Sequence, residues 1–427
     1  MAKGGRVEDA LSGLLALEKQ TRLASDALST ARVMKAIVQL CFDLQQWELL
    51  NEHILLLTKK RSQLKTAIAA MVEECCKFVD QTPDHETKLK LIDTLRAVSE
   101  GKIYVEVPRA RLTLELAHIK ERDGDIKKAA DILQELQVET FGSMEKNDKV
   151  HFILEQMRLC LANKDYIRTQ IISRKVNTKF FQEESDVVQD LKLKYYHLMI
   201  ELCLHEGNYI AVSQHYRAVF DTPKVRKDPL LWKIALKSAV LFVLLARYNN
   251  DQSDLMHRIY EEKQLQHIPL YRELLDCFRT QELLYWDAFC SKYTVILRSG
   301  VQDEPPIEIL ATGTKLGDTL FDELKKRVIE HNIRVIALYY TRISMQRLAD
   351  LLVLSAEDTE EFVSSLVANK TVYARIDRPK GIVLFTPSQD PSQVLNEWSS
   401  HLNTLMSLVA KTTHLINKEE MVHTLVK

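Results

Sequence analysis

For most of the chain, apolar residues recur every three or four positions, which is the spacing of one face of an α-helix. Ile153, Met157 and Cys160 show the pattern well. Few residues interrupt it, because the 427 residues include only eleven glycines and ten prolines, and no proline lies between Arg109 and Thr222. The pattern predicts a mainly α protein.

Polar turns recur along the N-terminal part with a period of about 40 residues. Segments 122–133, 162–173 and 205–216 each end one helix and begin another, and their matching positions are Ile126, Tyr166 and Tyr209. Segment 44–55, with Trp47, and segment 247–258 fit the same period. Gly124 and Gly207 suit the left-handed residue that often ends a helix. We predict a TPR-like α-solenoid of helical hairpins over residues 1–230; the alternative is that polar turns merely resemble one another.

The pattern changes after Tyr339. Residues 345–353 form a short amphipathic helix, and a second helix starts at Ser355, with Asp358 in a variant of the capping box. Two β-rich runs follow, 372–377 and 382–385, joined by the turn at 378–381. This order predicts a winged helix over residues 341–388, preceded by a helical part over residues 231–340.

The first β-rich run alternates two kinds of side chain. Val372, Ala374 and Ile376 are expected to face the core, and the intervening residues to face solvent or a partner. An open hairpin edge can pair with a strand of another chain. The predicted partner interface of the sheet consists of Tyr373, Arg375, Asp377, Ile382 and Val383.

A winged helix can also bind DNA by inserting its second helix into the major groove. Here that helix carries four carboxylates, which oppose phosphate binding; they are Glu357, Asp358, Glu360 and Glu361. Arg375, Arg378 and Lys380 in the wing can contact a phosphate backbone, but a solvated turn is the more ordinary interpretation. The residues favour a protein partner.

A segment rich in proline and glycine, residues 299–318, is predicted to be an exposed loop. The helix after it has an apolar face made of Leu320, Phe321, Leu324, Val328 and Ile329.

The chain closes with a helix predicted from Ser392 to about Lys418, within a C-terminal segment 389–427. Its apolar positions alternate steps of three and four, as in a heptad seam; they are Leu395, Trp398, Leu402, Leu405, Val409, Thr412 and Ile416. The spacing favours a helix that packs against helices of other chains in a bundle, and the alternative is a helix that folds back on its own domain.

Composition narrows the protein class. The net charge is −1, from 58 basic and 59 acidic residues, so no broad attraction to nucleic acid or anionic lipid is expected. Seven cysteines without CxxC spacing are expected to be free thiols in a reducing compartment. The N-terminus has no apolar signal core, and the longest apolar run, 239–246, is too short to cross a bilayer. A soluble protein of the cytoplasm and nucleus is expected.

The chain has no recognisable catalytic motif. It lacks a GxxxxGK[ST] loop, a GxSxG elbow and a GxGxxG run, and Gly313-Thr314-Lys315 has no upstream glycine. The nearest histidines, His197 and His205, are eight residues apart, whereas a helical zinc site needs spacings of three or four. We predict no catalytic residues, no cofactor, no metal and no small-molecule substrate.

Helical repeats that run into a winged helix resemble the PCI-domain family, which comprises scaffold subunits of the proteasome lid, the signalosome and a translation initiation factor. Runs that closely resemble a lid member span nearly the whole chain: 101–113, 131–146, 152–182, 191–200, 327–352 and 405–421. One departure is an N-terminus shorter than is usual in that family.

The resemblance implies a non-catalytic scaffold of the 26S proteasome regulatory-particle lid, which supports ubiquitin-dependent protein degradation. Its PCI domain would pair edge to edge with other lid subunits, and its last helix would join their helical bundle. The solenoid would contact the base and core particle. The alternatives are the equivalent subunit of the signalosome and, more remotely, a winged-helix nucleic-acid-binding protein. A third alternative, a ubiquitin hydrolase, would require that the isolated chain cleave a ubiquitin-chain substrate.

Overall fold

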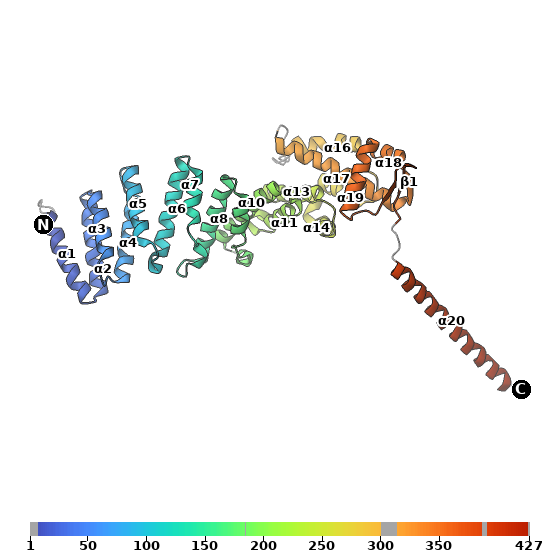
Figure 1. Cartoon of the computed structure of the whole chain (residues 1–427), viewed down its shortest axis with the longest axis horizontal. Helices are drawn as coiled ribbons and strands as arrows, with labels where there is room; N and C mark the ends of the chain where they lie inside the picture. Colours follow the sequence, from blue (N-terminus) through green and yellow to red (C-terminus); the bar gives the residue numbers. More distant parts are fainter. Residues whose placement is uncertain (1–6, 184, 300–313, 387–390, 426–427) are drawn as a thin grey trace. The chain divides into compact units, whose positions relative to one another are not determined.

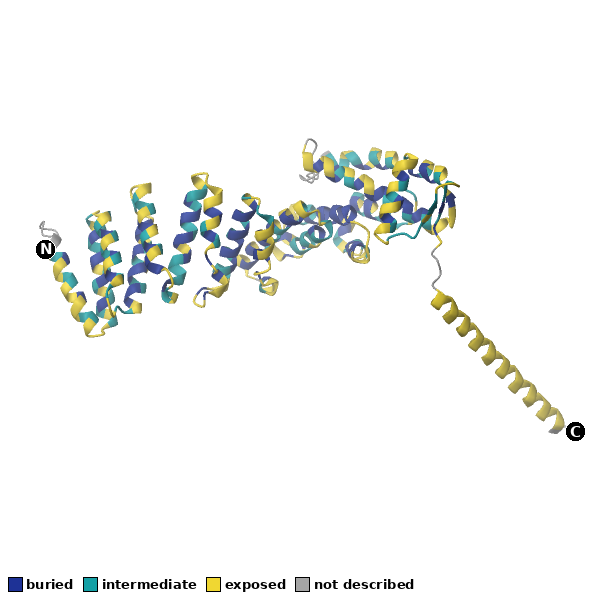
Figure 2. Cartoon of the chain, in the orientation of Figure 1, coloured by how far each residue is buried: buried dark blue, intermediate teal, exposed yellow. Residues whose placement is uncertain are grey.

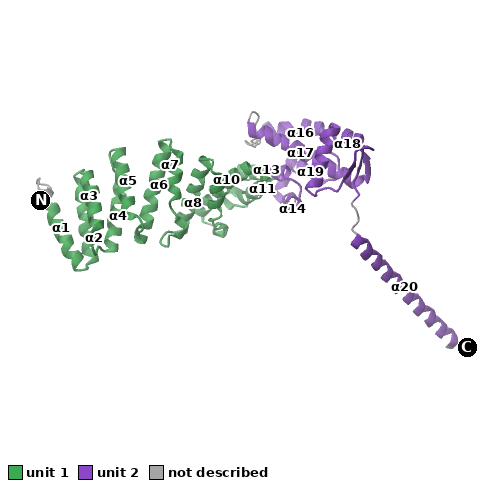
Figure 3. Cartoon of the chain, in the orientation of Figure 1, with its two compact units in different colours: residues 1–239 green, residues 240–427 purple. Residues whose placement is uncertain are grey.

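The structure is a computed structural model that describes residues 7–183, 185–299, 314–386 and 391–425. It is mainly α-helical, as predicted, with one small antiparallel sheet (Figure 1). The chain forms two compact units, residues 1–239 and 240–427 (Figure 3).

The first unit is a succession of helices. They are α1 Val7–Leu23, α2 Ala27–Asp43, α3 Trp47–Lys59, α4 Lys65–Val79, α5 His85–Ser99, α6 Glu106–Arg122, α7 Ile126–Gln134, α8 Lys146–Ala162, α9 Tyr166–Ser173, α10 Asp186–Glu206, α11 Tyr209–Phe220 and α12 Pro223–Lys227, followed by α13 Pro229–Leu245, which continues past the unit boundary. Short 3₁₀ turns lie at Ile103–Val105, Val138–Thr140 and Thr178–Gln182.

Most helices of this unit pack against the next helix, against the one after that, or against both. Helix α2 contacts α3 and α4, and α8 contacts α9 and α10. Figure 2 shows a buried stripe along these helices. The core is therefore a series of clusters, as expected for a solenoid, and one cluster extends from Leu11 in α1 to Ile119 in α6.

The turns between paired helices share one backbone conformation. A residue with positive φ lies two positions before the first residue of α2, α3, α7, α9 and α11; these residues are Ser25, Gln45, Gly124, Lys164 and Gly207. In the α8–α9 turn the amide of Asp165 then donates to the carbonyl of Cys160 at 2.9 Å, which is the long bond of a Schellman motif.

Four of the five repeat segments predicted from the sequence are confirmed by these turns, whereas in segment 247–258 a helix begins at Asn250 with no positive-φ residue two positions before it. Trp47, Ile126, Tyr166 and Tyr209 are each the first residue of a helix. Gly124 and Gly207 have φ values of +88° and +69°, in the left-handed region predicted for them. All seven cysteines are free, and Cys41, Cys75, Cys160 and Cys203 are buried.

The second unit begins within α13 and ends with the long C-terminal helix. Its elements are α14 Asn250–Tyr260, a 3₁₀ turn at Lys263–His267, α15 Pro269–Arg279, α16 Trp286–Ser299, α17 Lys315–Tyr339, β1 Arg342–Ser344, α18 Met345–Leu352, α19 Ala356–Ala368, β2 Arg375–Asp377, β3 Ile382–Leu384 and α20 Pro391–Leu425.

The predicted loop at 299–318 is partly wrong. Ser299 belongs to α16, and α17 already begins at Lys315, where the hydroxyl oxygen of Thr314 accepts a hydrogen bond from the amide of Gly317 at 3.2 Å. The N-cap threonine outweighs the glycine and starts the helix early. Residues 300–313 lie outside the described residues. The apolar face predicted for α17 is buried, with Phe321 half-buried.

The winged-helix elements fold around one core. Helix α18 and the start of α19 lie where predicted, and the hydroxyl of Ser355 accepts from the amide of Asp358 at 3.1 Å. The core includes Ile343, Leu348, Val363 and Val383.

Strands β2 and β3 are shorter than the predicted β-rich runs 372–377 and 382–385. Strand β1 has no counterpart in the prediction. Val372 and Ala374 pack against the core, as expected, although they precede the hydrogen-bonded strand β2.

Candidate interaction surfaces

The sheet of the winged helix has the order β1-β3-β2, and both pairs are antiparallel. Val383 in the central strand pairs with Ile343 on one side and with Ile376 on the other. Strands β1 and β2 are therefore the edges, and either can accept a further strand.

The five sheet residues predicted to contact a partner occupy different environments. Arg375 is exposed, and its guanidinium carbon lies 5.7 Å from the ring centroid of Tyr373. Tyr373, Asp377 and Ile382 are half-buried. Val383 is 0% exposed, because the central strand directs it into the core. The side chain of Val383 is thus closed to a partner in this conformation, and the candidate surface comprises the other four residues.

Two of the three wing cations have carboxylate partners within the domain. Nε of Arg378 donates to Glu360 on α19 at 2.7 Å, and Lys380 lies 3.6 Å from Asp377. Glu357, Asp358 and Glu361 on α19 are exposed. The helix that would enter a DNA groove therefore presents negative charge, and much of the wing's positive charge is already neutralised.

Helix α20 exposes a long apolar surface that no other described element buries. It runs from Pro391 to Leu425, longer at both ends than predicted, and every residue from 391 to 424 is exposed (Figure 2). All seven seam positions are exposed. The six apolar residues among them, which are the predicted bundle interface, have these exposed fractions: Leu395 60%, Trp398 62%, Leu402 43%, Leu405 56%, Val409 49% and Ile416 59%.

A second apolar row lies beside that seam and was missed. Val394, Leu408, Leu415 and Val422 lie at multiples of seven positions from one another, each directly before a seam position or at its heptad equivalent. Their exposed fractions range from 40% to 57%. The seven-residue spacing was readable from the sequence. With the seam, this row widens the apolar face to about three positions in seven, which is typical of a helix inside a bundle rather than in a two-stranded coiled coil.

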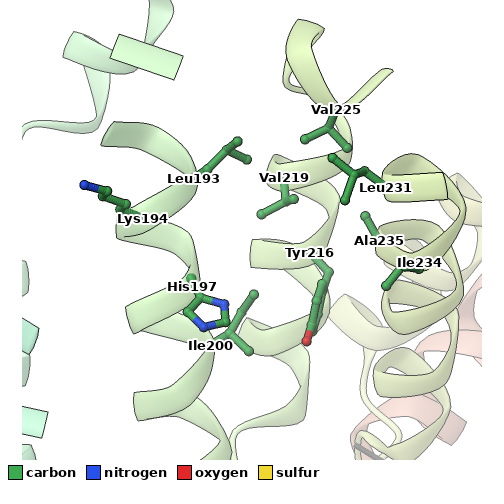
Figure 4. A pocket seen from close by; sticks show the side chains of 10 residues that line it. All are labelled: Leu193, Lys194, His197, Ile200, Tyr216, Val219, Val225, Leu231, Ile234 and Ala235. Atoms are coloured by element: carbon green, nitrogen blue, oxygen red, sulfur yellow. The ribbon is translucent and has the colours of Figure 1, made fainter. Parts of the chain in front are cut away.

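A groove of about 400 Å³ lies between α10, α11, α12 and α13. Figure 4 shows its side chains, mostly apolar, with the ammonium of Lys194 directed away from the others. Burial raises the pKa of Tyr216, which lines the groove, to about 12. Its lining residues come from four helices, so no local sequence pattern indicated it.

Among the described residues, no cluster of His, Cys, Asp and Glu has the arrangement of a metal site. No described helix is long and apolar enough to span a bilayer.

Comparison with known families covers most of the chain. Residues 9–228 match the family described as PSMD12/CSN4, N-terminal, and residues 300–387 match the PCI domain. Residues 392–424, which lie within α20, match the family described as 26S proteasome regulatory subunit RPN5 C-terminal domain.

Relatives that match nearly the whole chain belong to the same proteasome subunit family. The chain is 46% identical over 423 residues to 26S proteasome non-ATPase regulatory subunit 12 of Dictyostelium discoideum, covering 99% of this chain and 92% of the relative. The chain belongs to this family. Homolog A of the same subunit in Arabidopsis thaliana is 43% identical, with 99% of each chain covered.

A subunit of the signalosome, the alternative left open by the sequence, is also among the relatives, at lower identity. COP9 signalosome complex subunit 4 of Drosophila melanogaster is 22% identical over 360 residues, covering 84% of this chain and 80% of the relative. The family of proteasome regulatory subunit 12 thus matches at about twice the identity and over more of the chain.

Proposed function

We propose that this chain is a non-catalytic scaffold subunit of the proteasome regulatory-particle lid, in the cytoplasm and nucleus. The relatives at 43–46% identity are named as non-ATPase regulatory subunits of the 26S proteasome. The observation that carries the proposal is α20, a helix with a wide apolar face and no buried residue between 391 and 424.

Exposure of this kind favours assembly. A helix of 35 residues is about 50 Å long. Its exposed leucines, its valines and Trp398 form a continuous apolar patch along the helix. Single exposed apolar side chains are ordinary on a protein surface, but a continuous patch marks a protein interaction site. Burial of each large apolar side chain contributes about 1.5–3 kcal/mol, so a bundle of partner helices would hold α20 firmly.

The edge strands supply a second, smaller contact. Pairing of a neighbour's strand with β2 would satisfy the backbone groups of the edge, and Arg375 and Tyr373 would select the neighbour by their side chains. In this proposal the sheet joins adjacent PCI domains edge to edge, α20 enters the lid's helical bundle, and the solenoid reaches the base and core particle.

Deletion of residues 395–427 tests the proposal. The truncated chain should keep its melting temperature, because the deleted residues that the structure describes are all exposed, yet it should fail to enter the lid. The measurement is mass spectrometry of proteins that co-purify with tagged full-length and truncated chains from cells. Normal incorporation of the truncated chain would reject the bundle, and co-purification of the full chain with signalosome subunits alone would favour the alternative assembly.

A further inference from the structure

The helical part of the second unit contains a cavity of about 290 Å³, lined by residues of α14, α15 and α17 and of the segments beside them. Ser253, His257, Arg279, His331 and Arg334 are among its polar lining residues. No lining residue is an aspartate or a glutamate. The lining residues therefore carry no negative charge of their own, although Asp276, outside the lining, forms an ion pair with Arg279.

Arg334 brings a positive charge to this wall without a matching carboxylate. Its guanidinium carbon lies 3.7 Å from the ring centroid of Tyr248, and it makes no ion pair among the described residues. The nearby Glu330 is already engaged, because Nη1 of Arg327 donates to it at 2.6 Å. Burial, together with the charge of Arg327, lowers the pKa of Arg334 to about 10 against the opposing effects of Tyr248 and Glu330.

Arg279 is held in place from two sides. Its guanidinium carbon lies 4.3 Å from the ring centroid of Tyr260. Its Nε donates to Oδ1 of Asp276 at 2.9 Å, and its Nη2 lies 2.8 Å from the same oxygen. The Nη1 group makes no further hydrogen bond among the described residues. The guanidinium group of Arg279 is thus held in one orientation, and its Nη1 group remains able to donate a hydrogen bond to a ligand.

His331 and Asn332 add no negative charge beside Arg334 and Arg279. Nε2–H of His331 donates to the carbonyl of Glu282 at 3.1 Å, and burial followed by the charge of Arg334 lowers the pKa of His331 to about 4. The ring is therefore neutral near pH 7. The segment beside the cavity is itself fixed, because Asn332 makes two hydrogen bonds of 2.8 Å to the backbone of Leu284. The site is built before any ligand arrives.

We propose that this cavity binds the phosphate group of a small phosphate ester, with Arg334 and Arg279 as its two charged donors and the hydroxyl of Ser253 as a third. Guanidinium groups bind phosphate oxygens through short charge-assisted hydrogen bonds. Donors on α14, α15 and α17 approach from different elements, which suits a tetrahedral anion better than a planar carboxylate. The cavity exceeds the roughly 30 Å³ of one water several-fold, so it leaves room for the rest of an ester.

Calorimetric titration of the full chain with pyrophosphate and with inorganic phosphate tests the site, at constant ionic strength set by chloride. We expect saturable binding of one anion per chain. Arg334→Gln and Arg279→Gln should each weaken it about tenfold or more, because each removes a charge-assisted bond. Arg272→Gln is the matched control: Arg272 also stacks on Tyr260, at 5.3 Å, but does not line the cavity, so its affinity should equal that of the unmodified chain.

Several results would overturn the proposal. These are no saturable binding, equal weakening in Arg272→Gln, and full affinity in Arg279→Gln. Acetate that binds as tightly as phosphate would instead assign the cavity to a carboxylate and reject the phosphate ester. Should Arg334→Gln fail to fold, the more exposed Arg279 decides alone.

Discussion

The winged helix and α20 are neighbours in sequence, yet their apolar residues have opposite fates. Winged-helix residues such as Leu348 and Val363 are at most 1% exposed, whereas Leu395 and Trp398 in α20 are about 60% exposed. Both segments show regular apolar spacing. The spacing alone therefore predicts a helix or a strand, but it does not say whether the burying partner belongs to the same chain.

What separates the two segments is the number of elements that converge on each apolar face. The winged helix brings α17, α18, α19 and three strands around one core. Helix α1 at the other end of the chain is also tied down from within, through Leu11 and through Glu18, which is 0% exposed. Among the described residues, α20 has no buried side chain, so its apolar face gains no packing from its own chain.

The largest effect is expected for Val383→Asp in the centre of the sheet. An unpaired carboxylate in this fully buried position should cost about 3–5 kcal/mol and unfold the winged helix. Thermal denaturation followed by circular dichroism measures it. Ser364→Asp, which adds the same charge to the exposed face of α19, should leave the melting temperature nearly unchanged. Equal melting of both variants would mean that Val383 is not enclosed by its own domain.

The second effect concerns α1. Nζ of Lys60 donates to Oε2 of Glu18 at 2.8 Å, while Arg22 and Gln63 each donate to Oε1 at 3.1 Å. Glu18→Gln should cost about 1–3 kcal/mol at neutral pH, because it weakens charged hydrogen bonds in a buried site. Hydrogen exchange of α1 measures the loss, and Glu48→Gln on the exposed face of α3 is the control.

This site also predicts a dependence on pH. Burial raises the pKa of Glu18, but the hydrogen bonds from Lys60 and Gln63 and the nearby positive charges outweigh it and hold the pKa below the ordinary 4.5. A lowered folded-state pKa stabilises the fold fully above the unfolded value and loses that stability as the pH falls through the folded value. Protection of α1 should therefore decline on acidification in the unmodified chain and less in Glu18→Gln. Equal declines would contradict this role of Glu18.

The smallest effect is expected in the repeated turns. Gly207 and Lys164 have φ values of +69° and +60° at equivalent turn positions. Gly207→Ala should destabilise the solenoid by about 1 kcal/mol, since a Cβ disfavours this conformation, and Lys164→Gly should stabilise it by less than about 1 kcal/mol. Urea unfolding measures both. Changes of the same sign would show that the two turns are not equivalent.

The sequence revealed most of what is local. The turn positions Ile126, Tyr166 and Tyr209, the cap at Ser355 and the seam of α20 all follow from spacing or from one side chain's hydrogen bond. What it did not reveal depends on distant partners. Strand β1 is three residues long and is defined by its pairing with β3 about 40 positions later.

Site residues follow the same division. Val383 was placed at an interface because alternation along one strand does not show that the strand is central, with neighbours on both sides. Arg279 and Arg334 were missed because they lie 55 positions apart and only α15 and α17 bring them to one cavity. The polar spacing along one helix does not show that its side chains line a cavity together with side chains of another helix.

The central claim is that α20 is a surface for other subunits and not part of its own domain's core. Leu402→Asp at the seam and Asn403→Asp one position later place the same charge on the same exposed helix. In the isolated chain the free energy of unfolding of both variants should lie within about 0.5 kcal/mol of that of the unmodified protein. In cells, tagged Leu402→Asp should lose co-purification with proteasome lid subunits, while Asn403→Asp should retain it. Full incorporation of Leu402→Asp, or a marked loss of stability in its isolated chain, would contradict the account.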